Sequence, residues 1–230
     1  MDLRIISIGA LSAHPLRGEK QPVRAGHTTT SLIHAGKKKI LVDPGLPEQA
    51  VVARLEERAG VKPREITHVF LTSFNPEARR GLLAFDQAVW WIGQAEREAI
   101  GAALVAKVQE AAEEGDEQMQ RVMEQDIAIL RRCEAAPDHV ADEKGDRVDL
   151  FPLPGVTPGL CGLIVVMQRF TTLVCGDAVA TVEHLEQGKV LPVVSDVDKA
   201  RESFAEAVEI ADMLVLGRDN VVVNPTKRPF

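Results

Sequence analysis

The chain has 230 residues, of which 45% are hydrophobic, 27% charged and 4% aromatic. This length and balance suit a globular protein with one extensive core, and they exclude a disordered tail, a collagen-like repeat and a coiled-coil rod. The formal net charge of −7 disfavours a nucleic-acid partner, because binding to a phosphate backbone depends on clustered lysine and arginine.

Hydrophobic patterns along the chain predict strands in runs, interrupted by a few helices. Short apolar, β-branched stretches predict strands at Leu3–Leu11, Thr28–Ile33, Ile40–Asp43, Ile66–Thr72, Ala88–Ile92, Val148–Leu153, Gly162–Met167, Thr171–Cys175, Met213–Leu216 and Val221–Val223. Helical spacing predicts one helix from Pro47 to Gly60 and another over Asp198–Asp212. This order favours two mixed sheets packed face to face with helices outside over a doubly wound parallel sheet, although the pattern alone does not decide between them.

A helical hairpin is predicted at about residues 94–134, as an insert within a single domain of residues 1–230. Its apolar residues recur at helical spacing as two groups: Ile100, Leu104, Val108 and Ala111, and Met119, Met123, Ile127 and Leu130. A methionine row of this kind is more often a core face than a cofactor site. Glu96–Glu134 contains ten acidic and five basic residues, which indicates either a solvated face or a surface for a homo-oligomer or another partner.

The cysteines and the first residues predict a cytoplasmic protein. Cys133, Cys161 and Cys175 are odd in number and far apart, so neither a disulfide framework nor a CxxC metal site is indicated. The start of the chain lacks a secretory signal pattern. No apolar run approaches the roughly 20 residues that cross a bilayer, so we expect no membrane partner.

Polar residues that follow predicted strands are the candidates for chemistry, because strand ends commonly carry binding and catalytic loops. The segments are Val42–Gly45, Thr72–Gly81, Pro154–Gly159, Gly176–Ala178 and Leu216–Asn220. With Phe70-Leu71 before Thr72 and Cys175 before Gly176, their order and spacing resemble the metallo-β-lactamase fold superfamily over nearly the whole chain. The resemblance implies a four-layer αββα sandwich in the α/β (α+β) class, and an ancestral hydrolase with one or two metal ions, usually zinc, that activate water.

The chain departs from that family at almost every metal ligand. Ser73, Asn75 and Ala78 stand where the family has three histidines, and Glu77 stands where it has aspartate. Val156 and Arg218 replace the two later histidines, and only Asp177, which bridges the metals in the family, is retained. The resemblance gives pocket-shaping roles to Asp43, Thr72, Gly155, Thr157 and Gly176.

The six histidines do not supply an alternative set of zinc ligands, because none is paired with another at i, i+2 or i, i+4. They lie at positions 14, 27, 34, 68, 139 and 184. Oxygen donors such as Glu77 and Asp177 leave Mg²⁺ or Ca²⁺ as an alternative cofactor. The preferred hypothesis is that no cofactor is held and that Arg218 replaces the ion, because a guanidinium pairs with two carboxylates in a forked geometry. The alternative for Arg218 is an exposed surface arginine.

Three functions remain open. The first is a protein that has lost the hydrolase activity and acts as a binding or regulatory module, with a small polar molecule in the former pocket. The second is an enzyme that cleaves an ester or thioester through a rebuilt site, although Ser73 and Cys161 lack an evident histidine base. The third is a structural or oligomerisation protein that uses the acidic hairpin. We favour the first, without a catalytic residue.

Overall fold

Two mixed sheets of six strands each form the centre of the molecule in the computed structural model, which describes residues 1–143 and 146–227. The first sheet has the order β1-β2-β3-β4-β5-β6. Its strands are β1 (Asp2–Ser7), β2 (Thr30–Ala35), β3 (Lys38–Val42), β4 (His68–Leu71), β5 (Val89–Ile92) and β6 (Glu134–Ala135). The strands from β1 to β3 pair antiparallel, and those from β3 to β6 pair parallel.

The second sheet has the order β12-β11-β10-β9-β8-β7. Its strands are β7 (His139–Glu143), β8 (Asp146–Pro152), β9 (Cys161–Val166), β10 (Thr171–Val174), β11 (Met213–Val215) and β12 (Val221–Val223). Only β10 and β11 pair parallel, so this sheet is also mixed.

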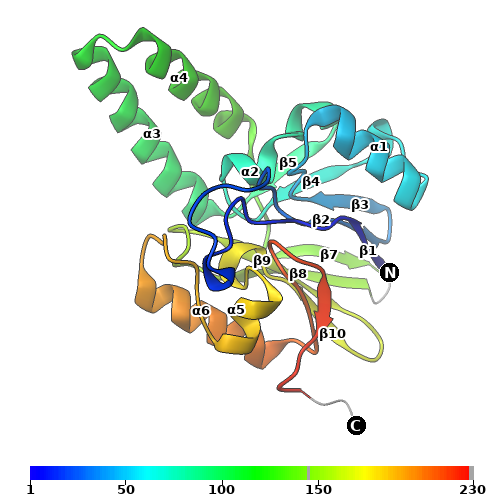
Figure 1. Cartoon of the computed structure of the whole chain (residues 1–230). Helices are drawn as coiled ribbons and strands as arrows, with labels where there is room; N and C mark the ends of the chain where they lie inside the picture. Colours follow the sequence, from blue (N-terminus) through cyan, green and yellow to red (C-terminus); the bar gives the residue numbers. More distant parts are fainter. Residues whose placement is uncertain (144–145, 228–230) are drawn as a thin grey trace.

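The helices flank the two sheets (Figure 1). The α-helices are α1 (Glu48–Ala59), α2 (Pro76–Arg79), α3 (Gln94–Glu114), α4 (Glu117–Arg132), α5 (Val182–Gln187) and α6 (Val197–Ile210). Short 3₁₀ helices are η1 (Pro15–Arg17), η2 (Pro63–Glu65), η3 (Leu82–Phe85) and η4 (Gly176–Ala178). None of the helices in the described residues is long and apolar enough to span a bilayer.

Alternation along the strands explains the layers, because successive side chains of a strand point to opposite faces. In β4, for example, Phe70 packs between the sheets, whereas Val69 and Leu71 pack under the helices on the outer face. The cluster between the sheets draws residues from both, including Val42 and Leu163. A third cluster joins the outer face of the second sheet to α6 through Ala207. The predicted four-layer αββα sandwich is therefore confirmed.

The predicted hairpin of α3 and α4 is also present, and it extends away from the sandwich (Figure 1). Gly115 ends α3 in a left-handed conformation with φ of 73°, and Asp116 caps α4 by accepting a hydrogen bond from the Met119 amide. Met123 and Ile127 pack against the core, as the spacing predicts. The prediction is wrong for Met119, whose side chain is 47% exposed because it lies at the outer end of the hairpin.

Several predicted boundaries shift, and some elements were missed. The first strand ends at Ser7 rather than Leu11, because the chain leaves the sheet where Gly9 lies against the backbone of Thr29. The edge strands β6 and β7 were not predicted because their sequences are polar, and the short helix α5 was not predicted either. Edge strands tolerate polar residues on both faces, so they lack the period that marks a strand.

Candidate functional site

Four loops at strand ends meet at one end of the sandwich and carry the polar residues singled out by the sequence. Asp43 follows β3 and Thr72 follows β4, while Asp177 lies in η4 after β10. Arg218 lies in the loop between β11 and β12. Because these strands belong to both sheets, the loops converge over the seam between the sheets.

Arg218 forms a fork with two carboxylates at the centre of this region. Its Nε donates to Asp177 Oδ1 at 2.6 Å and its Nη2 donates to Asp177 Oδ2 at 2.7 Å, a bidentate pair. Its Nη1 donates to Glu77 Oε2. The side chains of Arg218 and Asp177 are only 3% and 4% exposed, while that of Glu77 is 30% exposed. We call these three residues the arginine cluster.

The charge of Arg218 is fixed by this arrangement. Burial alone lowers the pKa of Arg218, but its pairing with Asp177 and Glu77 outweighs burial and raises that pKa above its ordinary value. The guanidinium is therefore protonated at neutral pH. Two acids and one permanent cation leave the arginine cluster with one net negative charge when both acids are ionised.

Backbone hydrogen bonds hold the loop that carries Arg218. The Arg218 amide donates to the Ala180 carbonyl at 2.7 Å, and the Thr29 amide donates to the Gly217 carbonyl at 2.8 Å. Gly217 has no room for a side chain, because a Cβ there would lie 2.4 Å from the carbonyl oxygen of Gly176. Glycine at 217 thus allows the β11–β12 loop to pack directly against the backbone of Gly176, which places Arg218 next to Asp177.

Glu77 is held by its own short helix and by the loop between β1 and β2. Asn75 caps α2 by accepting a hydrogen bond from the Glu77 amide at 3.0 Å. The Glu77 carbonyl accepts from the Thr28 amide at 3.2 Å. Gly26 lies directly over the carboxylate, since a Cβ there would be 2.4 Å from Glu77 Oε1. The returning arm of the β1–β2 loop therefore covers the cluster.

Asp43 supports the site from below and does not bind Arg218. Its carboxylate accepts hydrogen bonds from the Thr72 amide at 2.8 Å and the Thr72 hydroxyl at 2.6 Å. Burial raises the pKa of Asp43 to about 7, against the smaller opposite effect of these two hydrogen bonds. Its φ of 48° is unusual for a non-glycine residue, so this position is a strained turn that joins β3 to the site. The Gly176 turn, with φ of 52°, packs against Thr72.

The other positions that the resemblance aligns with metal ligands have no side chain that could bind a transition metal well. Ser73 and Ala78 are buried, and half-buried Val156 packs against the apolar cluster under α6. The Thr157 hydroxyl is buried without a hydrogen-bond partner among the described residues. Gly155, with φ of 127°, lies so close to Ala200 of α6 that a Cβ would be 2.1 Å from its amide nitrogen.

Glu96, which the sequence placed in a solvated acidic stretch, is instead fully buried beneath the site. One carboxylate oxygen accepts from the Phe74 amide at 3.0 Å and the other from the Gly159 amide at 3.0 Å. Glu96 therefore joins two site loops to the first turn of α3. The helical position could be read from the sequence, but no local signal marks this acid as buried.

Arg79, in the Thr72–Gly81 segment, does not lie in the arginine cluster. Its Nη2 pairs with Asp126 of α4 at 2.8 Å, and its Nε donates to the Phe74 carbonyl at 3.0 Å. Arg79 thus ties the hairpin to the loop that follows β4. With Glu96, it gives the hairpin a rigid attachment to the sandwich.

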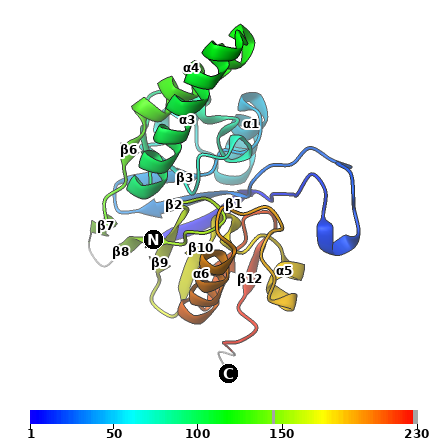
Figure 2. The ribbon, with the colours of Figure 1, turned by 90° about the vertical axis from the view of Figure 1, so that its left-hand side faces the viewer.

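A second polar cluster fixes the β1–β2 loop, which extends outward on the side of α5 (Figure 2). His14 Nε2 lies 3.1 Å from both the Thr181 hydroxyl and Glu183 Oε2, and the same hydroxyl lies 2.9 Å from His184 Nδ1. Burial raises the pKa of Glu183, but hydrogen bonds from the backbone, Arg17 and Thr181 outweigh it and lower that pKa to about 2. His14 and His184, which are far apart in the sequence, thus form a buried polar contact through Thr181 that attaches the β1–β2 loop to the region of α5.

Comparison with known proteins agrees with this architecture. The family model of the metallo-beta-lactamase superfamily matches residues 23–74, which include Asp43 and Thr72. No curated protein sequence matches the chain. Among solved structures, a candidate metallo-β-lactamase from Thermotoga maritima superposes with a TM-score of 0.67 at 15% identity, covering 96% of this chain and 98% of that one. The chain has the metallo-β-lactamase fold.

Two further solved structures that superpose on this chain are lactonases. A quorum-quenching N-acyl homoserine lactone lactonase superposes with a TM-score of 0.63 at 19% identity, covering 94% of this chain and 91% of that one. AidC, a dizinc quorum-quenching lactonase, superposes with a TM-score of 0.60 at 19% identity, covering 79% of this chain and 67% of that one. At these identities the likeness concerns the fold alone.

The residues present do not fit the dinuclear centre associated with the metallo-β-lactamase fold. Within residues 1–143 and 146–227, no group of three or more histidine, cysteine or acidic side chains could hold a metal ion. Both oxygens of Asp177 and one of Glu77 already accept hydrogen bonds from Arg218. A cation between these carboxylates would have to displace a guanidinium that is covalently part of the chain.

Proposed function

We propose that this protein is a metal-independent, non-catalytic form of the metallo-β-lactamase fold that acts as a binding or regulatory module. The observation that carries the proposal is the fork from Arg218 to Asp177 and Glu77. A metal hydrolase needs an exchangeable position on the ion, where water is activated. A guanidinium offers only N–H donors, and three of the five on Arg218 are used by carboxylates.

The arginine cluster supports a structural role by a simple electrostatic argument. Two acids close together in a mostly buried place repel each other and are poorly solvated. Arg218 removes that repulsion as a bound cation would, but without an open coordination position. The fold can therefore persist after its metal chemistry has been lost, because the apolar clusters on both faces of each sheet do not depend on the site.

A hydrolase with a rebuilt site is the weaker alternative. Ser73 is buried, and no histidine is hydrogen-bonded to it or to Cys161 among the described residues. Burial raises the pKa of Cys161 to about 11, which leaves the thiol protonated near neutral pH. The carboxylate of Asp43 already accepts hydrogen bonds from the Thr72 amide and hydroxyl.

Elemental analysis and cation titration of purified protein test the proposal. We expect less than about 0.1 equivalent of zinc, iron or manganese in the wild-type protein after growth with added metals, since zinc sites need three or four suitable ligands. We also expect no turnover of acyl homoserine lactones, thioesters or nitrophenyl esters above background. Stoichiometric metal, or hydrolysis that is lost with an Asp177→Asn change, would overturn the proposal.

A variant gives a positive readout for the ion-replacing role. Arg218→Ala leaves Asp177 and Glu77 facing an empty volume, so we expect this variant to gain affinity for Mn²⁺ or Ca²⁺ and to be stabilised by them in thermal unfolding. The matched control, Arg201→Ala, removes an exposed arginine of α6 and should behave like wild type. Equal responses of the two variants would show that Arg218 does not replace an ion.

A further inference from the structure

We propose that the helical hairpin of α3 and α4 is a homodimerisation arm, in which the acidic tip of each copy lies on the arginine-bordered groove at the root of the other. This inference does not depend on the function proposed for the arginine cluster. It rests on the groove, on its charges and on the charges at the tip.

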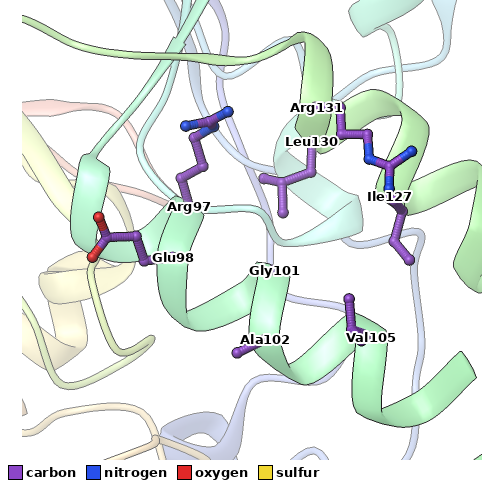
Figure 3. A pocket seen from close by; sticks show the side chains of 8 residues that line it. All are labelled: Arg97, Glu98, Gly101, Ala102, Val105, Ile127, Leu130 and Arg131. Atoms are coloured by element: carbon purple, nitrogen blue, oxygen red, sulfur yellow. The ribbon is translucent and has the colours of Figure 1, made fainter. Parts of the chain in front are cut away.

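The groove lies between α3 and α4 near their attachment to the sandwich and has a volume of about 290 Å³ (Figure 3). Its apolar part is lined by Gly101, Ala102, Val105, Ile127 and Leu130. Val105 is 50% exposed, and its neighbours in α3 are small, so a partner backbone can approach closely. Nothing in the described part of the chain covers this face.

Two guanidinium groups border the groove. Figure 3 shows Arg97 on α3 and Arg131 on α4 beside its apolar lining, and both are exposed. Neither forms an ion pair within the described residues, whereas Arg79 and Arg132 nearby are used by Asp126 and by the Asp86 carbonyl. The groove also has one acid, Glu98, which accepts a hydrogen bond from Gln94. The border therefore favours an acidic partner.

The tip of the same hairpin has the complementary charge. Five exposed acids lie at the tip: Glu110, Glu113, Glu114, Asp116 and Glu117. At about 100° per residue, Glu110 and Glu114 lie on the side of α3 opposite the groove, so Glu113, Asp116 and Glu117 are the acids available to a partner on the groove's side. Of these, only Glu117 forms an ion pair in the described chain, a 3.4 Å contact with the highly exposed Arg121. The exposed Met119 adds an apolar side chain beside these acids. The tip thus offers what the groove can bind: carboxylates next to an apolar group.

A twofold axis satisfies both contacts at once. When two hairpins lie antiparallel, the tip of each meets the root of the other, so residues of one chain form two identical contacts. A face of two helices, each about 10 Å wide and about 30 Å long, has an area of about 600 Å². Two copies would bury about 1,200 Å², the lower end of the range for specific interfaces. We therefore expect a dimer that dissociates on dilution.

Charge reversal on each side, followed by mixing, tests the pairing. The groove variant is Arg97→Glu with Arg131→Glu, and the tip variant is Glu113→Lys with Glu117→Lys. All four positions are exposed, so both variants should fold. In light scattering after size exclusion, the wild type should have the mass of two chains, and each variant should have half that mass. An equimolar mixture should regain the dimer, because both contacts in the mixed pair join opposite charges.

The control is Arg58→Glu with Arg201→Glu, which makes the same charge change on α1 and α6 and should leave the dimer intact. A wild-type protein that is monomeric at every concentration would overturn the proposal. So would a dimer that survives both reversals, because another surface would then hold it. If both variants are monomeric but their mixture does not dimerise, the tip does not bind the groove.

Discussion

Replacing Arg218 by methionine removes the one cation that neutralises the buried carboxylate of Asp177. Methionine keeps much of the side-chain volume, so the change probes charge more than packing. The Asp177 carboxylate is 4% exposed, and Arg218 supplies a hydrogen bond to each of its oxygens. Removing one partner of such a buried pair destabilises a protein by about 3–5 kcal/mol.

Urea unfolding at pH 7, followed by circular dichroism, measures this loss. For a domain of this size about 2–4 °C in Tm corresponds to each kcal/mol, so the midpoint of thermal unfolding should fall by roughly 6–20 °C. Adding Asp177→Asn to the methionine variant should recover about 2 kcal/mol or more, because the unpaired buried charge is then removed. This recovery separates an electrostatic cause from a loss of packing.

The pH dependence supplies a second check. In the methionine variant, the buried carboxylate of Asp177 is penalised only while it is ionised, because burial disfavours the charged form. The penalty is therefore lost when the carboxylate is protonated, so the difference in the free energy of unfolding between the variant and the wild type should shrink on acidification. A methionine variant within about 1 kcal/mol of wild type at pH 7 would refute the reasoning, since Arg218 would then not neutralise a buried acid.

Three further predictions follow from buried groups. Burial raises the pKa of Asp43 to about 7, so its contribution to the free energy of unfolding is complete below about pH 4 and is lost as the pH rises through 7. Urea titrations of the wild type should therefore show the free energy of unfolding falling between these pH values, on the order of 4 kcal/mol, and the Asp43→Asn variant should show a flatter profile. Parallel profiles for the two proteins would contradict this. Glu96→Gln replaces a charged acceptor of two backbone N–H groups, so chemical denaturation should show that the free energy of unfolding falls by about 2–4 kcal/mol. For the exposed control Glu98→Gln, it should fall by less than about 0.5 kcal/mol. Burial raises the pKa of the Cys133 and Cys161 thiols to about 11 and raises that of Cys175 further. A thiol reagent at pH 8 should therefore react at least about 100-fold more slowly with the native protein than with the unfolded chain. Rapid labelling of the native protein would show instead that these thiols are accessible.

Most strands, the main helices and the absence of metal-binding side chains at several aligned positions could be predicted from the sequence, and the four-layer arrangement was predicted from its resemblance to a known fold. Alternation in stretches such as Ile40–Asp43 and Thr171–Cys175 reflects which face of a strand is buried, and that pattern is local. The absence of donor atoms at Ala78 and Val156 is also a property of the side chains alone, independent of how the chain folds. The helical hairpin followed from spacing and from the turn residues Gly115 and Asp116.

Which charged side chains pair with one another depends on the tertiary structure. Arg218 is 41 residues from Asp177 and 141 from Glu77 in the chain, so no local pattern could establish their fork. Glu96 and Arg79 show the same limit, because an acid in a first helical turn and an arginine at the end of a short helix are usually solvated, whereas here they join α3 and α4 to the site. Hydrophobic periodicity is a property of residues that are close in sequence. The partner of a buried charge, by contrast, depends on how elements that are remote in sequence pack together.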